Sequence, residues 1–162
     1  MARQRHLLVA VLLAAAALLI VLVITGVWLH QSYRPDDDQP VRIIHRLASQ
    51  ALIGVFLTAV IVAFLRRRER ALSSVALVSV VVASFTGFLL PWDQLALWAV
   101  TVSEDLDGFR PLYDDRVRFV IIGGAEVAPA TVLWWLAVHV GVAVAAIACT
   151  VARLAHLRTT PR

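Results

Sequence analysis

Four long apolar segments, separated by polar connections of different lengths, dominate the pattern of this sequence. Each contains about 20 residues or more without a formal charge. An α-helix rises about 1.5 Å per residue, so a segment of this length crosses the roughly 30 Å hydrocarbon core of a bilayer. The pattern therefore predicts an all-α membrane protein, a four-transmembrane-helix bundle that forms a single domain over residues 1–162. We expect its helices at about 7–29, 43–65, 71–90 and 129–152.

The composition supports a membrane location and excludes several classes of function. Of the 162 residues, 60% are apolar, and the mean hydropathy is +0.82, as is typical of an integral membrane protein. All 15 Lys and Arg residues are arginines, and most of them lie at the ends of apolar segments and not in a patch with interleaved aromatic residues, so we expect no nucleic-acid binding. The single cysteine, Cys149, excludes a disulfide framework, a thiolate metal cluster and a CxxCH site for covalent haem.

The distribution of arginine predicts the orientation of the helices. The N-terminal end, the turn at 66–70 and the C-terminal tail hold nine arginines, whereas the other two connections hold six arginines among ten acidic residues. Because arginine-rich loops stay in the cytoplasm, we expect both termini to be cytoplasmic and the acidic connections to face outward. The expected location is a bacterial-type cytoplasmic membrane, which the chain crosses several times.

The connection at 91–128 is long and acidic. Loops of this length rarely lack secondary structure, so we expect short surface helices at about 95–102 and 115–122. In the orientation given above, the connection lies at the outer face, next to the start of the fourth helix.

Two histidines are notable because each lies in an apolar segment. His45 begins the second predicted helix, and His139 lies about ten residues into the fourth. An ionisable side chain within a membrane is costly and marks a candidate functional site. Two imidazoles on facing helices of a bundle are suitable axial ligands for a haem iron. The alternative, a hydrogen-bonded core histidine at either position, stays open.

Several motifs resemble the cytochrome b family of quinol-oxidising complexes, particularly its shorter four-helix subunit of the photosynthetic type. GFLLPWDQLALWAVTV at 87–102 resembles the end of the family's third helix, and RIIHR at 42–46 resembles the surroundings of its first haem-ligating histidine. ITGVWL at 24–29 is similar to the end of the first helix, and GGAEVAPATVL at 123–133 is similar to the approach to the fourth. The resemblance covers essentially the whole chain and implies the family's N-terminal haem domain.

The resemblance implies one non-covalent haem b and its contacts. The implied site residues are the axial ligands His45 and His139, the haem-face glycines Gly26 and Gly87, and the propionate contacts Arg42 and Arg46. For both arginines, a role as an anchor at the membrane interface stays open. The arginine that the family carries five residues before the histidine of helix four is Trp134 here.

The resemblance also implies that a second haem site has been lost. Members of the family carry a second histidine fourteen residues after the first on helices two and four, and glycines paired at the same interval on helices one and three. Fourteen residues make about four turns, or about 21 Å. The four inner positions of this chain hold Ala59, Arg153, Leu12 and Ser73. We therefore expect one outer haem site and a degenerate inner one.

Two functions stay open. In the first, the chain is a non-catalytic subunit that passes electrons between quinol or quinone, such as menaquinone, and a redox partner at the outer face. An iron–sulfur, molybdenum or cytochrome c protein would be that partner, and a subunit similar to the C-terminal half of cytochrome b, with its PEWY-type loop, would join them. In the second, the chain anchors an extracytoplasmic redox enzyme and has no functional haem. A transporter is disfavoured, because paired broken helices and central charges are missing.

Overall fold

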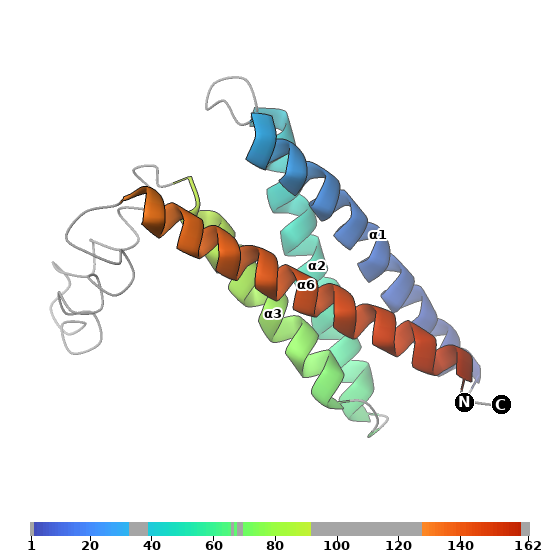
Figure 1. The fold of residues 1–162 in the computed structure, drawn as a ribbon. Coiled ribbons are helices and arrows are strands. Elements are labelled where there is room, and N and C mark those ends of the chain that lie inside the picture. The colour runs from blue at the N-terminus through green and yellow to red at the C-terminus, as the bar shows by residue number, and fades with distance from the viewer. Residues whose placement is uncertain (1, 33–38, 66, 68–69, 92–127, 160–162) are drawn as a thin grey trace, which may run out of the picture. The chain divides into compact units, whose positions relative to one another are not determined.

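The structure is a computed structural model that describes residues 2–32, 39–65, 67, 70–91 and 128–159. These residues form the four α-helices of Figure 1, and each helix is long and apolar enough to cross a membrane. The prediction of four helices of membrane-spanning length is thereby confirmed. Their bounds are α1 Ala2–Ser32, α2 Gln39–Leu65, α3 Arg70–Leu89 and α6 Pro129–Thr159. The short helices expected at 95–102 and 115–122 lie outside the described residues.

Two helices continue beyond the apolar segments that predicted them. α1 begins at Ala2 and not near residue 7, and α6 ends at Thr159 and not near residue 152. An apolar run marks only the part of a helix that lies in hydrocarbon, whereas backbone hydrogen bonds continue into polar flanks that lack Gly and Pro. Residues 2–6 and 153–159 contain neither Gly nor Pro, so the sequence supplies no earlier stop.

Prolines mark three of the helix ends. Pro40 and Pro129 occupy the first turns of α2 and α6, where the missing N–H leaves no helical hydrogen bond unmade. Pro91 follows the end of α3, as predicted from the sequence. The last turn there closes with a hydrogen bond of 3.1 Å, in which the amide of Leu90 donates to the carbonyl of Thr86.

The chain divides into two compact units. The first unit, Met1–Ser84 with Val142–Arg162, contains α1, α2, most of α3 and the second half of α6. The second unit is Phe85–Gly141. Within the first unit, α1 packs along α2 (Figure 1). The single domain over residues 1–162 stays a prediction.

All four helices contribute to one buried core in the first unit. Phe56 of α2 is fully buried in it, and Ala15, Ala76 and Ala146 belong to it from α1, α3 and α6. Small side chains at these positions let the helix backbones approach closely, which is a usual basis of helix association in a membrane. The first unit is therefore a helical bundle with its own packed interior.

The first turns of α1 and the last turns of α6 are neighbours in the first unit. Leu8 and Leu12 of α1 are buried together with Val62 of α2, and Leu154 and Leu157 of α6 pack against them. An even number of membrane crossings brings the two ends of a chain to one side. The packing of these helix ends is in accord with that expectation.

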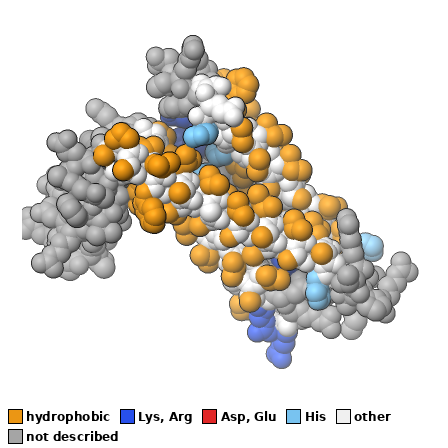
Figure 2. All heavy atoms as spheres, in the orientation of Figure 1, with side chains coloured by type: hydrophobic (Ala, Val, Ile, Leu, Met, Phe, Trp, Pro, Cys, Tyr) orange, Lys and Arg blue, Asp and Glu red, His pale blue; other side chains and the backbone are white. Residues whose placement is uncertain are grey.

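Hydrophobic side chains cover the outside of the described helices. Figure 2 shows them across the visible face of the helices. On α1, the side chains of Ile20, Ile24 and Val27 are each more than half exposed. A helix that is apolar on all sides is suited to a membrane and not to water. The exposed surface therefore agrees with the membrane location predicted from composition.

Candidate functional site

His45 of α2 is held by Thr25 of α1. Oγ1 of Thr25 lies 2.8 Å from Nδ1 of His45. The same hydroxyl lies 2.7 Å from the carbonyl oxygen of Val21, one turn earlier in α1. A hydroxyl has one hydrogen, and Thr25 donates it to this carbonyl, so the hydroxyl accepts a hydrogen bond from the histidine. Nδ1 of His45 therefore carries a proton.

This assignment makes Nε2 the nitrogen of the His45 ring that bears a lone pair. A histidine that ligates a metal through one ring nitrogen usually donates from the other, and the acceptor of that proton sets the tautomer and the orientation of the ring. His45 is half-buried at the start of a membrane helix. Its protonation and position thus suit it to metal ligation.

Gly26, the residue after Thr25, leaves room for the imidazole ring of His45. A Cβ built at Gly26 would lie 3.3 Å from Cε1 of His45 and 3.9 Å from Nδ1. The shorter distance is tighter than an ordinary van der Waals contact, so a larger residue would press on the ring. Glycine is the residue that allows a backbone to come this close to a neighbour.

The second unit repeats the arrangement with Thr86 and Gly87 of α3 and His139 of α6. Oγ1 of the fully buried Thr86 lies 3.1 Å from Nδ1 of His139. A Cβ built at Gly87 would lie 3.0 Å from Cε1 and 3.4 Å from Nδ1 of the same ring. The contact at Gly87 is therefore tighter than the contact at Gly26.

Each unit thus contains a histidine with a threonine hydroxyl at Nδ1 and the following glycine against Cε1. One such contact is unremarkable in helix packing. Two alike are what a pair of equivalent imidazole ligands requires, because each ligand needs an oriented ring and room beside it. The fold and these side chains together define an integral membrane protein of the helical class with two candidate imidazole ligands.

The two arginines beside His45 differ in their surroundings. Arg42 is half-buried and precedes His45 by three residues, so it lies on the same side of α2. Arg46 is exposed and follows His45 directly, about 100° further around the helix. The position of Arg42 favours it as the neighbour of a group bound at His45. Arg46 lines a small pocket of about 160 Å³ with Ile43, Leu47 and Gln50, all from α2.

The four inner positions singled out in the sequence are all buried in the first unit. Leu12, Ala59 and Ser73 are 0% exposed, and Arg153 is 1% exposed. Ala59 belongs to the four-helix core, and Leu12 packs with Val62 of α2. Side chains therefore pack this end of the bundle.

Comparison with known proteins identifies the family. The family described as Cytochrome b(N-terminal)/b6/petB matches residues 52–161, more than half of the chain. Cytochrome b6 of Picosynechococcus sp. is 30% identical over 109 residues, covering 61% of this chain and 48% of the relative. The cytochrome b6 proteins of Crocosphaera subtropica and Rippkaea orientalis are 30% and 28% identical over 106 residues, with the same coverage. No solved structure matches. The chain belongs to the cytochrome b N-terminal/b6 family, a family of haem-binding electron-transfer proteins.

The family match covers one of the two histidines with its threonine and glycine neighbours. Thr86, Gly87 and His139 lie inside the matched residues, whereas Gly26 and His45 precede them. The assignment of Gly26 and His45 therefore depends on their structural likeness to Gly87 and His139. The chain spans about half the length of the curated relatives it matches.

Thr25 and Thr86 are site residues that only the structure brings out. A signal for them is present in the sequence, since the dipeptide Thr-Gly occurs twice, at 25–26 and 86–87. Both copies lie near the end of an apolar segment. Repetition of a short pair at equivalent places in two helices indicates equivalent contacts, and here each pair meets a histidine.

Proposed function

We propose that this chain is a b-type cytochrome subunit that binds one haem through His45 and His139. The observation that carries this proposal is the matching environment of the two imidazoles, each held at Nδ1 by a threonine. A haem brings four nitrogen ligands of its own, so two imidazoles complete the coordination of its iron. Membership of the cytochrome b N-terminal/b6 family supports the same cofactor.

In this proposal, the residues around the imidazoles hold and orient the ligands. Thr25 accepts the proton on Nδ1 of His45, which fixes the tautomer of that ring, and each threonine hydrogen bond restrains the rotation of its imidazole. Gly26 and Gly87 leave the room that a flat macrocycle beside a helix needs. The apolar helices keep water away from the site, which increases the influence of nearby charges such as Arg42. When bound, the haem supplies one-electron transfer between its ferrous and ferric states.

We infer a single haem, at the outer site, with a degenerate inner site. The inference is supported by the burial of Leu12, Ala59, Ser73 and Arg153, which stand at the four positions where the family carries the glycines and histidines of its inner site. Neither Ala59 nor Arg153 offers an imidazole there. Dense packing of this kind resists a large ligand, because a protein interior contains few voids larger than a water molecule.

Arg42 is the proposed partner of a haem propionate, and Arg46 is a second candidate. A guanidinium forms short, charge-assisted hydrogen bonds with a carboxylate, and such bonds are about twice as strong as neutral ones. The half-buried position of Arg42, on the His45 side of α2, supports the first assignment. Anchoring at the membrane interface is the alternative role of both arginines.

The proposed setting is a bacterial-type cytoplasmic membrane with both termini in the cytoplasm and the haem near the outer face. The distribution of arginine and the packing of the start of α1 against the end of α6 support this orientation. The chain would act as a non-catalytic subunit that passes electrons between quinol or quinone, menaquinone among them, and an outer-face partner. An iron–sulfur, molybdenum or cytochrome c protein would be that partner, together with a subunit similar to the C-terminal half of cytochrome b.

The packed inner end of the first unit supports a second candidate function. A bundle with its own buried core can serve as a structural membrane anchor for an extracytoplasmic redox enzyme without a functional haem. The two candidates differ in one property, because only the first requires a haem that responds to quinol.

Reduction of the haem by a quinol distinguishes the electron-transfer subunit from the membrane anchor. In membranes that contain the intact complex, added quinol should reduce a b-type haem, observed by absorption spectroscopy. The variants His45→Ala and His139→Ala should lose this signal, while immunodetection shows the same amount of inserted protein. Full quinol-linked turnover in both variants would contradict the electron-transfer proposal and support the anchor.

A further inference from the structure

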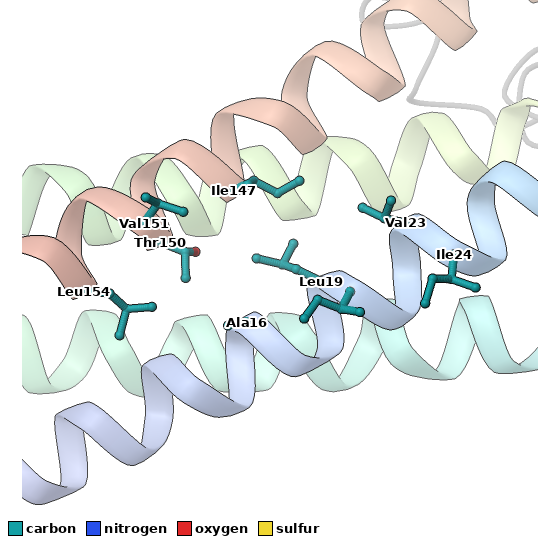
Figure 3. A pocket seen from close by; sticks show the side chains of 9 residues that line it. Ala16, Leu19, Val23, Ile24, Ile147, Thr150, Val151 and Leu154 are labelled. Atoms are coloured by element: carbon teal, nitrogen blue, oxygen red, sulfur yellow. The ribbon is translucent and has the colours of Figure 1, made fainter.

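Three of the four helices present only apolar side chains to their surroundings over their central parts in the first unit. The exposed residues are all apolar at 7–27 of α1, at 71–81 of α3 and at 142–152 of α6. The pocket between α1 and α6 that Figure 3 shows keeps to this pattern. Its volume is about 330 Å³, and its one polar side chain, Thr150, donates its hydrogen to the carbonyl of Ala146. Lipid chains therefore suit all of these surfaces.

The exposed face of α2 departs from this pattern. Gln50 is exposed there, and Gly54 and Thr58 are exposed at the next two intervals of four residues, so the three lie along one line of the helix. Arg46 precedes Gln50 by one turn and is the last charged residue before the uncharged run at 47–65. Gly54 lies a further turn, about 6 Å, deeper than Gln50. This line of α2, defined by Gln50, Gly54 and Thr58, therefore runs into the hydrocarbon.

Gln50 brings a primary amide to this depth. The amide has two N–H donors and a carbonyl acceptor, and a lipid chain can satisfy none of them. A lipid headgroup at the level of Arg46 lies one turn away, toward the water. In membranes, glutamine side chains form hydrogen bonds across helices and help to hold the helices together. A second transmembrane helix is therefore the neighbour that suits Gln50.

Gly54 leaves room for such a helix. A Cβ built at Gly54 would meet no atom within 4 Å, so the space beside the backbone is open. Small residues of this kind let two helix backbones approach closely in a membrane. A pocket of about 160 Å³ lies beside Gln50 at the outer end of the line. The face thus combines close approach of two backbones with a group that forms hydrogen bonds.

The same face of a second copy matches these features. Copies of one chain cross the membrane in one orientation, so a two-fold axis along the membrane normal brings each residue of α2 to the depth of its counterpart. Gln50 then meets Gln50 of the second copy. The two amides are complementary, because each both donates and accepts. Thr58 makes no such demand, since its hydroxyl already donates to the carbonyl of Gly54 over 2.9 Å.

Arg46 restricts where two such helices cross. Like charges at this position repel, and α2 contains no Asp or Glu that would offset them. Arg46 lies eight residues, or about 12 Å, before Gly54. Helices that pair through small residues commonly cross at about −40°, so they diverge on both sides of their contact. A crossing at Gly54 therefore separates the two arginines, which lie toward the interface, where water and salt screen their charge.

We propose that the exposed face of α2 centred on Gln50 and Gly54 pairs with the same face of a second copy of this chain, forming a parallel dimer. The pairing satisfies the two amides and leaves the apolar faces of α1, α3 and α6 to the lipid. It does not depend on the haem assignment, because neither Gln50 nor Gly54 belongs to the candidate haem site.

Disulfide crosslinking in membranes that contain the full chain tests which surface meets the second copy. In a Cys149→Ser background, oxidation of Gly54→Cys or of Ala51→Cys, on the same face, should yield a product of twice the 17.8 kDa mass of the chain. Val78→Cys, 60% exposed on the apolar face of α3, is the matched control and should stay monomeric. Equal crosslinking on the two helices, or none at either α2 position, would overturn the proposal, as would a crosslink to a protein of another mass.

Energy transfer between copies labelled at residue 162 with a donor or an acceptor, in lipid vesicles, measures the strength of the pairing. Gln50→Leu should weaken the dimer about tenfold, because two interhelical hydrogen bonds are lost, whereas Gln50→Asn keeps a donor and an acceptor and should retain most of the affinity. Gly54→Leu should abolish the dimer by keeping the backbones apart. Gly141→Leu, at another glycine with open space beside it, is the matched control and should have no effect.

An undiminished dimer in Gln50→Leu or in Gly54→Leu would contradict the proposal. His45→Ala should form the dimer as the wild type does, so failure of the haem assignment would be distinguished from failure of this one.

Discussion

Oγ1 of Thr25 lies 2.8 Å from Nδ1 of His45, across the contact between α1 and α2. Because Thr25 donates its own hydrogen to Val21, this contact identifies the protonated nitrogen of the imidazole. Nε2 is then the nitrogen suited to iron. In the second unit, Oγ1 of Thr86 lies 3.1 Å from Nδ1 of His139.

Loss of either threonine hydroxyl should weaken haem binding. Thr25→Val and Thr86→Val keep the shape of the side chain but remove the hydroxyl that forms a hydrogen bond with Nδ1. Mutation of such a partner typically costs 10- to 100-fold in metal affinity, and we expect a decrease of about this size in the haem retained on purification. Thr25→Ser keeps a hydroxyl at this position, so its haem content should equal that of the wild type.

Thr58→Val is the matched control for the threonine variants. Thr58 lies on α2, is exposed, and donates to the carbonyl of Gly54 over 2.9 Å without contacting a histidine. The haem content of the Thr58→Val variant should equal that of the wild type. If Thr58→Val lost as much haem as Thr25→Val, the hydroxyl of Thr25 would have no special role.

Alanine at the two site glycines should displace the imidazoles. At Gly87 the new Cβ would lie 3.0 Å from Cε1 of His139, and at Gly26 it would lie 3.3 Å from Cε1 of His45. We therefore expect haem content to fall in both variants, and further in Gly87→Ala. The ratio of haem to protein, measured by the pyridine haemochrome assay, checks this order.

Two other glycines in the same helices as the histidines serve as controls. A Cβ at Gly54 or at Gly141 would meet no atom within 4 Å. Alanine favours a helix interior over glycine by roughly 0.5–1 kcal/mol, so Gly54→Ala and Gly141→Ala should keep their haem and unfold no more readily than the wild type. Equal haem loss in all four variants would indicate a general effect on the helices and not a local one.

Restoration of the inner histidines alone should not create a second haem site. In the double variant Ala59→His with Arg153→His, Leu12 and Ser73 still occupy the positions that the family fills with glycine. We expect its haem-to-protein ratio to stay near that of the wild type. Addition of Leu12→Gly and Ser73→Gly to this double variant should raise its haem-to-protein ratio. The absorption signal of the outer haem reports whether the fourfold variant folds. A second haem in the double variant would show that packing does not exclude it.

Reporter tags test the orientation. Tags at residues 1, 68 and 162 should report the cytoplasm, and tags near Asp37 and Asp107 should report the outside, because arginine-rich ends are retained in the cytoplasm. A cytoplasmic signal at Asp107 would place the histidines at the opposite face and remove the proposed outer partners.

The helices were predictable from the sequence because hydrocarbon requires long uncharged runs, but their ends were not. α1 and α6 continue to Ala2 and Thr159, since polar flanks without Gly or Pro do not end a helix. His45 and His139 were detectable because an ionisable side chain in an apolar run is rare. Their threonine partners are 20 and 53 residues distant in sequence, so those contacts depend on how the helices pack.

The burial of Arg153 also could not be predicted from the sequence. It follows the last apolar segment, where an arginine ordinarily extends its charged group to water. The structure instead buries it to 1% exposure, because the ends of α1, α2 and α6 pack together around this level of the bundle. A pattern read along one helix contains no information about the neighbours that cover it.

The haem-to-protein ratio of the purified full chain, measured together with the spin state of the iron, tests the central claim most directly. We expect a ratio near one, a low-spin spectrum typical of two imidazole ligands, and a ratio near zero in His45→Ala and in His139→Ala. His30→Ala, an exposed histidine on α1, should keep the ratio of the wild type. A wild-type ratio near two, or full haem content in either ligand variant, would contradict the account.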